Sequence, residues 1–305
     1  MEHSGFQHEA LIYRDADDFL AATVPFLQDA LEAGEPALVA VRRANAALLE
    51  DALGDDRDQV RFADIEELGR NPARIIPFWR DFVDEHGGKP ARGIGEPVWP
   101  GREAAEIDEC QRHESLLDVA FPAPSSWSLL CPYDARGLED EVLVAVADSH
   151  PQVARDGVRE KSASYDGTRD CFAGTFPTCS DVAVAFEFRR DDLAAVRRRV
   201  EEEAEQVGLP TCDVADFVLA TSELAANSVV HGGGSGALRL WQEPGRLLVE
   251  VEDRGSIGEP LVGRLRPQPT QVGGRGLWIA NQLCDLVQIR SGTGGTRVRL
   301  QMALG

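Results

Sequence analysis

The stretch Thr221-Ser-Glu-Leu-Ala-Ala-Asn-Ser-Val-Val-His231 decides how the second half of the chain is interpreted. It lies in a helix expected over residues 213–230, where Glu223, Asn227 and His231 recur every four residues and so share one helical face. A carboxylate and a carboxamide one turn apart offer the hard oxygen ligands that Mg²⁺ accepts. The carboxylate can instead take a proton from an attacking hydroxyl group or water. Polar residues at this spacing also form ordinary solvated stripes, so the helix alone leaves these interpretations open.

Three further motifs follow this helix along the chain. Asp253 and Gly255 stand at the end of an apolar strand, where a carboxylate can reach an exocyclic amine and glycine lets the backbone pass close to a base. Gly273-Gly-Arg-Gly-Leu277 opens a helix, and backbone N–H groups at a helix start favour phosphate. Gly294-Gly-Thr-Arg-Val298 places Thr296 at the start of the last strand.

Taken in order, E-xxx-N-xxx-H, D-x-G, G-x-G-L and GT-x-V closely resemble the GHKL ATPase superfamily, which includes histidine kinases, type II topoisomerases, Hsp90 and MutL. The short lid from Gly255 to Gly274 and the Ser-Glu-Leu-Ala-Ala-Asn segment look like the RsbW/SpoIIAB class of anti-sigma factors, which are serine-protein kinases. The resemblance covers residues 181–305. It implies an α+β two-layer sandwich of the GHKL (Bergerat) type that binds ATP and Mg²⁺.

The resemblance also implies a role for each motif residue. Glu223 is the expected catalytic base, Asn227 the expected Mg²⁺ ligand and Asp253 the expected acceptor of the adenine amine. The other expected ATP contacts are Gly255, Gly258, Gly274, Arg275, Gly276, Leu277 and Thr296. Residues 274–276 would hold the phosphates, and Thr296 would support Asp253 and the base through a hydroxyl group or a water. The usual D-x-G-x-G reads Asp253-Arg-Gly-Ser-Ile-Gly258, a departure that bears on adenine affinity and lid mobility.

The first 150 residues alternate short apolar runs with amphipathic stretches. We expect strands at 10–13, 36–41, 60–62, 92–98 and 127–131, and helices at 15–33, 45–53, 71–85, 103–120 and 138–147. Such alternation predicts an α/β domain with a parallel sheet and helices on its faces. The sequence contains no GxxxxGK[ST] phosphate loop, and the acidic run at residues 15–18 would repel a phosphate.

Three segments of this half carry a second resemblance: His8-Glu-Ala-Leu-Ile-Tyr13, Glu35-Pro36 and Ile94-Gly-Glu-Pro-Val-Trp-Pro-Gly101. They look like the MEDS sensory domain, a RecA-like α/β fold without a phosphate loop. MEDS followed by an RsbW-like ATPase is the arrangement of actinobacterial RsbA-type regulatory proteins. Gly95-Glu96-Pro97 and Trp99 lie at a predicted strand end, where such sheets bind ligands, although the pattern favours a structural turn with a packed tryptophan.

The sequence therefore predicts three segments: a sensory domain at 1–150, a linker at 151–180 and an ATPase domain at 181–305. Proline and glycine interrupt any regular pattern in the linker. In the ATPase domain we expect strands at 182–188, 236–242, 246–252 and 296–302, and helices at 191–207, 213–230 and 276–287.

Composition restricts the possible partners. The chain has 52 acidic and 31 basic residues and a net charge of −21, which disfavours nucleic acid and anionic membrane and suits basic partners. The acidic N-terminus does not resemble a signal peptide and no apolar run is long enough for a bilayer, so we expect a cytoplasmic protein. The six cysteines are scattered, which favours free reduced thiols over a redox or metal role.

The leading hypothesis is an anti-sigma factor that sequesters a sigma factor and phosphorylates a serine or threonine of a STAS-domain anti-anti-sigma protein. The first domain would sense an unidentified small-molecule signal, and the resemblance implies a homodimer. One alternative is a sensor histidine kinase, for which His113 is the only passable phosphoacceptor. Another is a sigma-binding module without catalysis. A DNA-dependent ATPase is opposed by charge, because Arg197-Arg-Arg199 is followed by Glu201-Glu-Glu203.

Overall fold

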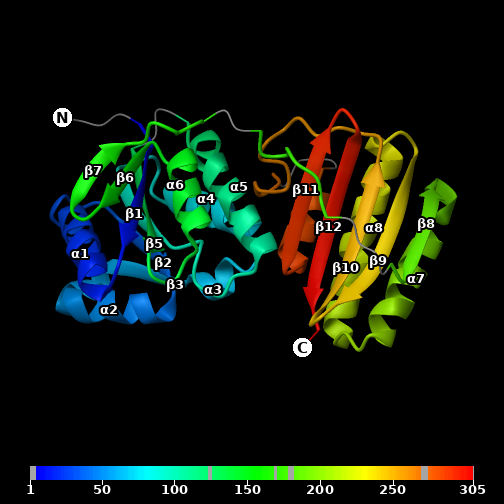
Figure 1. Ribbon diagram of the computed structural model, residues 1–305, viewed down its shortest axis with the longest axis horizontal. Helices are drawn as coiled ribbons and strands as arrows, with labels where there is room; N and C mark the ends of the chain where they lie inside the picture. The colour runs from blue at the N-terminus through cyan, green and yellow to red at the C-terminus, as the bar shows by residue number, and fades with distance from the viewer. Residues whose placement is uncertain (1–4, 123–125, 168–169, 178–181, 269–273, 305) are drawn as a thin grey trace. The chain divides into compact units, whose positions relative to one another are not determined.

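The computed structural model describes residues 5–122, 126–167, 170–177, 182–268 and 274–304 (Figure 1). The chain divides into two compact units, Met1–Arg169 and Asp170–Gly305. The division falls inside the stretch 151–180 that the sequence assigned to a linker. That stretch is not irregular throughout, because β6 (Gln152–Arg155) and β7 (Val158–Lys161) form a hairpin of the first unit.

The first unit is built on a seven-stranded sheet in the order β3-β2-β4-β5-β1-β6-β7. Its other strands are β1 (Gln7–Tyr13), β2 (Ala37–Val41), β3 (Val60–Asp64), β4 (Ala91–Gly95) and β5 (Trp127–Asp134). All pairings are parallel except β6 with β7. Every residue of β2 is buried, as expected for a central strand covered on both faces. The α/β class predicted from the sequence is confirmed.

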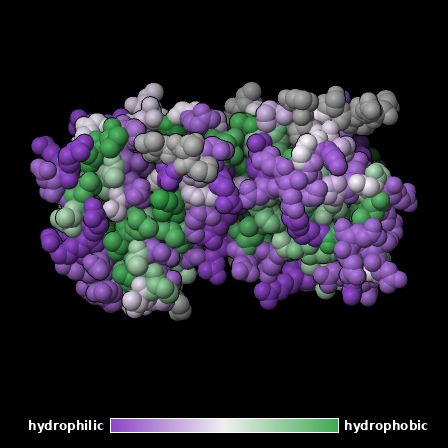
Figure 2. Space-filling model, turned by 180° about the vertical axis from the view of Figure 1, so that it is seen from behind, coloured by the Kyte–Doolittle hydropathy of each residue, from purple (hydrophilic) through white to green (hydrophobic). Residues whose placement is uncertain are grey.

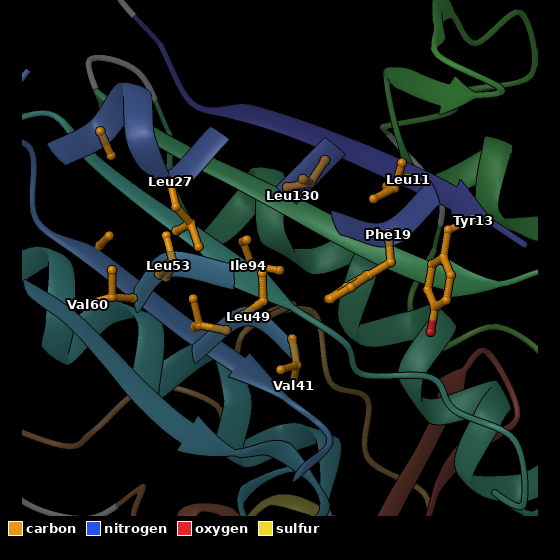
Figure 3. Packing of buried hydrophobic residues seen from close by; sticks show 13 residues of the cluster. Leu11, Tyr13, Phe19, Leu27, Val41, Leu49, Leu53, Val60, Ile94 and Leu130 are labelled. Atoms are coloured by element: carbon orange, nitrogen blue, oxygen red, sulfur yellow. The ribbon is translucent and has the colours of Figure 1, made fainter. Parts of the chain in front are cut away.

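Helices cover both faces of this sheet. On one face, α1 (Ala16–Glu32) and α2 (Arg43–Leu53) bury Phe19, Leu27 and Leu49 against alternate strand residues such as Leu11 (Figure 3). On the other face lie α4 (Ile75–Glu85), α5 (Ala104–Ala120) and α6 (Asp140–Ser149). The short helix α3 (Ile65–Leu68) follows β3.

Two glycines of β4 make room for the indoles on this second face. A Cβ atom at Gly93 would collide with the Trp127 ring, and one at Gly95 would lie 2.9 Å from Trp79 Cζ2. The two indole rings are 5.5 Å apart and both are buried. The packing of the two indoles therefore requires glycine at both positions. The strand ends at Gly95, three residues earlier than the sequence pattern indicated.

The second unit is a two-layer sandwich. Its antiparallel sheet has the order β11-β12-β10-β9-β8, from β8 (Val184–Arg189), β9 (Ser235–Glu243), β10 (Arg246–Asp253), β11 (Leu286–Gly292) and β12 (Gly295–Ala303). The helix α8 (Thr211–His231) lies between α7 (Leu193–Gln206) and α9 (Gly276–Leu283) and packs against the sheet. This is the α+β sandwich predicted from the motifs.

One element of this unit was predicted wrongly. The sequence indicated a helix over 276–287, but α9 ends at Leu283 and the chain turns to the extended conformation at Cys284. Residues 286–292 form the edge strand β11, whose first five residues are all buried. A short apolar run directly after a helix has no periodicity that distinguishes strand from helix.

The opposite face of the second sheet carries a charged ladder. Arg239 Nη1 lies 2.9 Å from carboxylate oxygens of both Glu250 and Glu252, and Arg299 Nη2 lies 2.8 Å from Glu250. The Phe176 ring stacks on the Arg299 guanidinium at 4.4 Å, so residues 170–177 belong to this unit. Figure 2 shows that hydrophilic side chains cover much of the molecular surface seen in that view. Among the described residues, no helix is long and apolar enough to cross a membrane.

The core of the first unit gives a test of its packing. Replacing Leu49, which is 0% exposed, with alanine is expected to cost about 2–5 kcal/mol of unfolding free energy. The matched change Val144→Ala, at a residue 73% exposed, should alter stability by no more than about 0.5 kcal/mol. Urea unfolding followed by circular dichroism measures both. Equal midpoints for the two variants would contradict the position of Leu49 in the core.

Candidate nucleotide site

The cavity that bears the sequence motifs lies between α8, the end of β10, the start of α9 and β12. It has a volume of about 310 Å³, and α8 lines it with Leu224, Asn227, Ser228 and His231. A pocket of this size suits a small-molecule ligand. The expected site residues that line it are Asn227, Asp253, Gly255, Gly258, Gly274, Gly276, Leu277 and Thr296.

Asp253, the last residue of β10, is held in place by two hydrogen bonds. Ser228 Oγ donates to Asp253 Oδ2 at 2.6 Å, and the Gly255 backbone N–H donates to Oδ1 at 2.8 Å. A carboxylate has roughly four acceptor positions, so about two remain for a ligand. Sequence reasoning missed Ser228, whose only signal was its position beside Asn227 on the cavity face of α8.

Glycines pack closely around this aspartate. A Cβ at Gly232 would overlap the Asp253 carboxyl group, and a Cβ at Gly295 would overlap its carbonyl oxygen. A Cβ at Gly255 would lie 2.8 Å from the carbonyl oxygen of His231. These three glycines are therefore needed because the backbone and Asp253 pack closely there, and not because the loop must be flexible.

A second set of hydrogen bonds fixes the loop after Asp253. Thr296 Oγ1 donates to the Gly255 carbonyl at 3.0 Å and lies 2.8 Å from Ser291 Oγ. The Ile257 backbone N–H donates to Ser291 Oγ at 2.8 Å. The direct hydroxyl contact to Asp253 is made by Ser228, and Thr296 acts on the loop through Gly255. Ser291 lies on β11, the strand that the sequence missed.

The displaced glycine of the D-x-G-x-G motif also has a structural explanation. Gly258 lines the cavity, but its φ is not positive and a Cβ there would meet no atom within 4 Å. Ile257 occupies the position of the usual second glycine and adds an apolar surface to the cavity. The loop conformation therefore does not depend on a glycine at 258.

The opposite end of the cavity is formed where α9 begins against α8. Gly274 has φ +70, the left-handed region that favours glycine. A Cβ at Gly276 would come 2.9 Å from Asn227 Nδ2 and 3.1 Å from Glu223 Oε2, so only glycine lets the α9 backbone approach these side chains. Glu223 and Arg275 do not line the cavity themselves, although Glu223 adjoins it through Gly276.

The part of the lid that the structure describes is held to α9. Asn281 Nδ2 donates to the Gly263 carbonyl at 2.9 Å, and Gly263, with φ +70, packs against Leu277. Residues 269–273, including the motif glycine Gly273, lie outside the described residues.

The cavity combines an apolar wall with polar ends. Leu224, Val251, Ile257, Val262, Leu277 and Val298 supply the wall. Asp253 and Glu259 are the lining residues that carry carboxylates. At the other end, Asn227 and the N-terminus of α9 provide an amide and free backbone N–H groups. A planar heterocycle with an amino group, joined to phosphates, matches this distribution of surface.

Comparisons with known families agree with this geometry. Residues 7–151 match the family model of MEDS, the MEthanogen/methylotroph, DcmR Sensory domain. Residues 186–302 match the model of the histidine kinase-like ATPase domain. The chain therefore combines a MEDS-type domain with a histidine kinase-like ATPase domain. This is the combination that its motifs predicted.

Similar solved structures include the RsbU and RsbW domains of Rv1364c from Mycobacterium tuberculosis, at 24% identity and TM-score 0.30, over 40% of this chain and 32% of that one. This chain thus spans about a third of the length of that structure. The catalytic domain of the histidine kinase ThkA, in a nucleotide-free form, matches at 16% identity and TM-score 0.26, over 39% of this chain and 95% of that one. No curated protein matches the chain.

The sequence left two interpretations open for the stretch at residues 95–99 in the first unit, a ligand site and a structural turn. Glu96 is fully buried and accepts hydrogen bonds from the Arg42 backbone at 3.0 Å, from Asn45 Nδ2 at 3.0 Å and from Tyr13 Oη at 3.3 Å. Burial raises the pKa of the Glu96 carboxyl, and the Arg42 guanidinium opposes this rise. Since its oxygens are occupied by protein donors, Glu96 joins the ends of three segments. This favours the structural interpretation of the turn.

The glycine contacts lead to a paired prediction. Gly255→Ala must displace the backbone near His231, and such overpacking typically costs about 1–3 kcal/mol. Gly258→Ala should be neutral or slightly stabilising, by up to about 1 kcal/mol, because nothing opposes the added methyl group. Thermal unfolding of the full chain compares the two variants. An equal loss of stability for both would show that the loop conformation is wrong.

Proposed function

We propose that this protein is an ATP- and Mg²⁺-dependent serine/threonine protein kinase and anti-sigma factor. It sequesters a sigma factor, phosphorylates a STAS-type anti-anti-sigma protein, and is regulated through its MEDS-type domain. The observation that carries this proposal is a cavity lined by Asp253 and Asn227, with Glu223 beside it against Gly276, in a histidine kinase-like ATPase domain.

Most residues of the proposed site bind ATP and Mg²⁺, and Glu223 acts in phosphoryl transfer. Asp253, held by Ser228, accepts a hydrogen bond from the adenine amino group. The apolar wall of the cavity packs against the adenine ring. The N-terminal N–H groups of α9 bind phosphate oxygens beside Gly276. Asn227 lines the cavity beside the start of α9, and its carboxamide oxygen is the kind of ligand that a partly hydrated Mg²⁺ accepts. Asn227 would hold the Mg²⁺ ion, which would supply positive charge to neutralise the phosphates.

Glu223 is the base in this proposal. Its carboxylate takes the proton of the partner's hydroxyl group as that oxygen forms a bond to the γ-phosphorus. The bond between the γ-phosphorus and the bridging oxygen breaks, and the electron pair leaves with ADP. Phosphoryl transfer requires mainly positioning and charge neutralisation, so few side chains suffice. The net charge of −21 suits a sigma factor that presents basic helices.

The histidine-kinase alternative finds little support among the described histidines. His113 is 1% exposed within α5, so its ring is not accessible to a kinase domain. His8 and His150 are also buried, and His231 lines the nucleotide cavity itself. A sigma-binding module without catalysis would transfer no phosphate, so the transfer assay with Glu223→Gln below separates it from a kinase.

Nucleotide binding is the first test. Calorimetry on the full chain should detect ATP·Mg²⁺ at micromolar affinity, and Asp253→Asn should weaken it by about 10- to 100-fold, because a hydrogen bond to a charged group contributes about 1.5–3 kcal/mol. Asn227→Ala should abolish the dependence on Mg²⁺. Asp216→Asn, also on α8 but away from the cavity, is the control. No binding by the wild-type chain would exclude the kinase and leave a sequestering protein.

Catalysis is tested by Glu223→Gln in the same full chain. ATP binding should persist, while transfer of labelled phosphate to a STAS-domain protein falls by about 10²–10⁴-fold through loss of the base. The product should be acid-stable phosphoserine or phosphothreonine. Acid-labile phosphate on the chain itself would instead support a histidine kinase, and wild-type rates in the variant would exclude Glu223 as the base.

A further inference from the structure

The second face of the first sheet contains four buried side chains that carry metal-ligating atoms. His8 lies on β1, Glu114 on α5, Cys131 on β5, and His150 directly after α6. One ligand atom from each residue lies within 4.8 Å of all the others, and each residue is at most 2% exposed. Residues of four separate elements thus converge on one point.

Strand register explains half of this convergence. β1 and β5 are parallel neighbours in which Ala10 pairs with Cys131 and His8 pairs with Leu129. His8 and Cys131 therefore lie diagonally on the same face of the sheet, since side chains alternate along a strand. Leu11 and Tyr13 point to the opposite face, against α1 (Figure 3). The α5 and α6 helices bring Glu114 and His150 over the same point.

The spacing suits a four-coordinate ion. Glu114 Oε2 lies 2.9 Å from His8 Nε2, 3.3 Å from His150 Nε2 and 3.7 Å from Cys131 Sγ. Cys131 Sγ lies 3.6 Å from His8 Nε2. Ligand atoms around a tetrahedral Zn²⁺ ion, with bonds of about 2.0–2.3 Å, are separated by about 3.3–3.8 Å. The four atoms are already close to that arrangement.

Both imidazole rings are oriented from outside the cluster. His150 Nδ1 lies 2.9 Å from the Val146 carbonyl oxygen, which can only accept, so Nδ1 carries the proton and Nε2 presents its lone pair to the cluster. His8 Nδ1 faces Asp118 Oδ2 at 3.9 Å, and Tyr165 donates to the same oxygen at 2.7 Å. An imidazole whose remote nitrogen faces a carbonyl or a carboxylate is the usual arrangement of a metal ligand.

Protein contacts do not satisfy this cluster. His150 Nε2, Glu114 Oε1 and His8 Nδ1 are buried without a hydrogen-bond partner. An unsatisfied buried polar group typically costs about 1–3 kcal/mol. A cation bound among the four side chains gives His150 Nε2 the partner that it lacks, and it leaves His8 Nδ1 facing Asp118.

We propose that His8, Glu114, Cys131 and His150 form a closed site for a divalent transition-metal ion, with Zn²⁺ as the ion that fits. Both imidazoles bind through Nε2, Cys131 through its sulfur and Glu114 through a carboxylate oxygen. The two nitrogens and one thiolate select Zn²⁺ and its neighbours over Mg²⁺ or Ca²⁺, which prefer oxygen. Binding releases the Cys131 thiol proton to solvent. The ion then clamps two strands to two helices.

Metal content of the untagged full chain tests this site. After exposure to Zn²⁺ and exhaustive dialysis, elemental analysis should find one zinc per chain, and chelation should lower the melting temperature. Cys131→Ala should weaken zinc binding by more than about 100-fold, since even changes outside the ligand set cost about 10–100-fold. The matched control is Cys110→Ala, at another buried cysteine whose sulfur faces the Pro97 carbonyl. Equal zinc content in the two variants would overturn the proposal.

A measurement on the wild-type chain makes the test independent of how the variants fold. X-ray absorption of the zinc-loaded protein should show one sulfur at about 2.3 Å and nitrogen or oxygen neighbours at about 2.0–2.2 Å. Co²⁺ in place of Zn²⁺ should give tetrahedral absorption bands with a thiolate charge-transfer band. A wild-type chain that keeps no zinc, or zinc without a sulfur neighbour, would sink the proposal. Neither result depends on nucleotide binding by the second unit.

Discussion

The second unit depends on how the carboxylate of Asp253 is held. Ser228 and the Gly255 N–H fix its two oxygens, and glycines 232 and 295 leave the space that its atoms need. A partly buried carboxylate is costly unless it accepts hydrogen bonds. The two hydrogen bonds join the end of β10 to α8 and to the loop that follows β10, so one side chain connects a strand, a helix and a loop of the sandwich. The cavity is the space left beside this junction.

The sequence predicted those parts of the site whose residue types are restricted. Asn227, Asp253 and Thr296 carry functional groups that few residues can replace, and they follow one another in the order of the GHKL motifs that the sequence resembles. Ser228 and Ser291 could not be predicted in the same way. Serine is common on any helix or strand, and its role depends on a hydroxyl direction that only the folded backbone defines. β11 was missed for a related reason, because its identity as a strand comes from pairing with β12.

In the first unit, the sequence predicted the fold but not which distant side chains meet in the core. Its α/β alternation was evident from local apolar runs, and the His8 to Tyr13 segment was informative as a family motif. The four side chains around Glu114 come from positions 8, 114, 131 and 150, and no local spacing connects them. The sequence favoured free thiols for the cysteines because it contains no pair with metal-ligand spacing. The parallel register of β1 and β5, which is a tertiary property, places Cys131 beside His8.

The two polar centres of the chain differ in what they leave available. At Asp253, protein donors occupy about half of the acceptor positions of the carboxylate, and the rest face a cavity of about 310 Å³. Around Glu114, all the groups belong to buried side chains, and no more than 2% of any of them is exposed. A partly satisfied carboxylate beside a cavity suits a ligand that binds and leaves during turnover. A fully enclosed set of ligand atoms exchanges slowly and suits an ion that stabilises the fold. The difference in enclosure therefore agrees with the two proposals, an exchanging nucleotide in the second unit and a structural ion in the first.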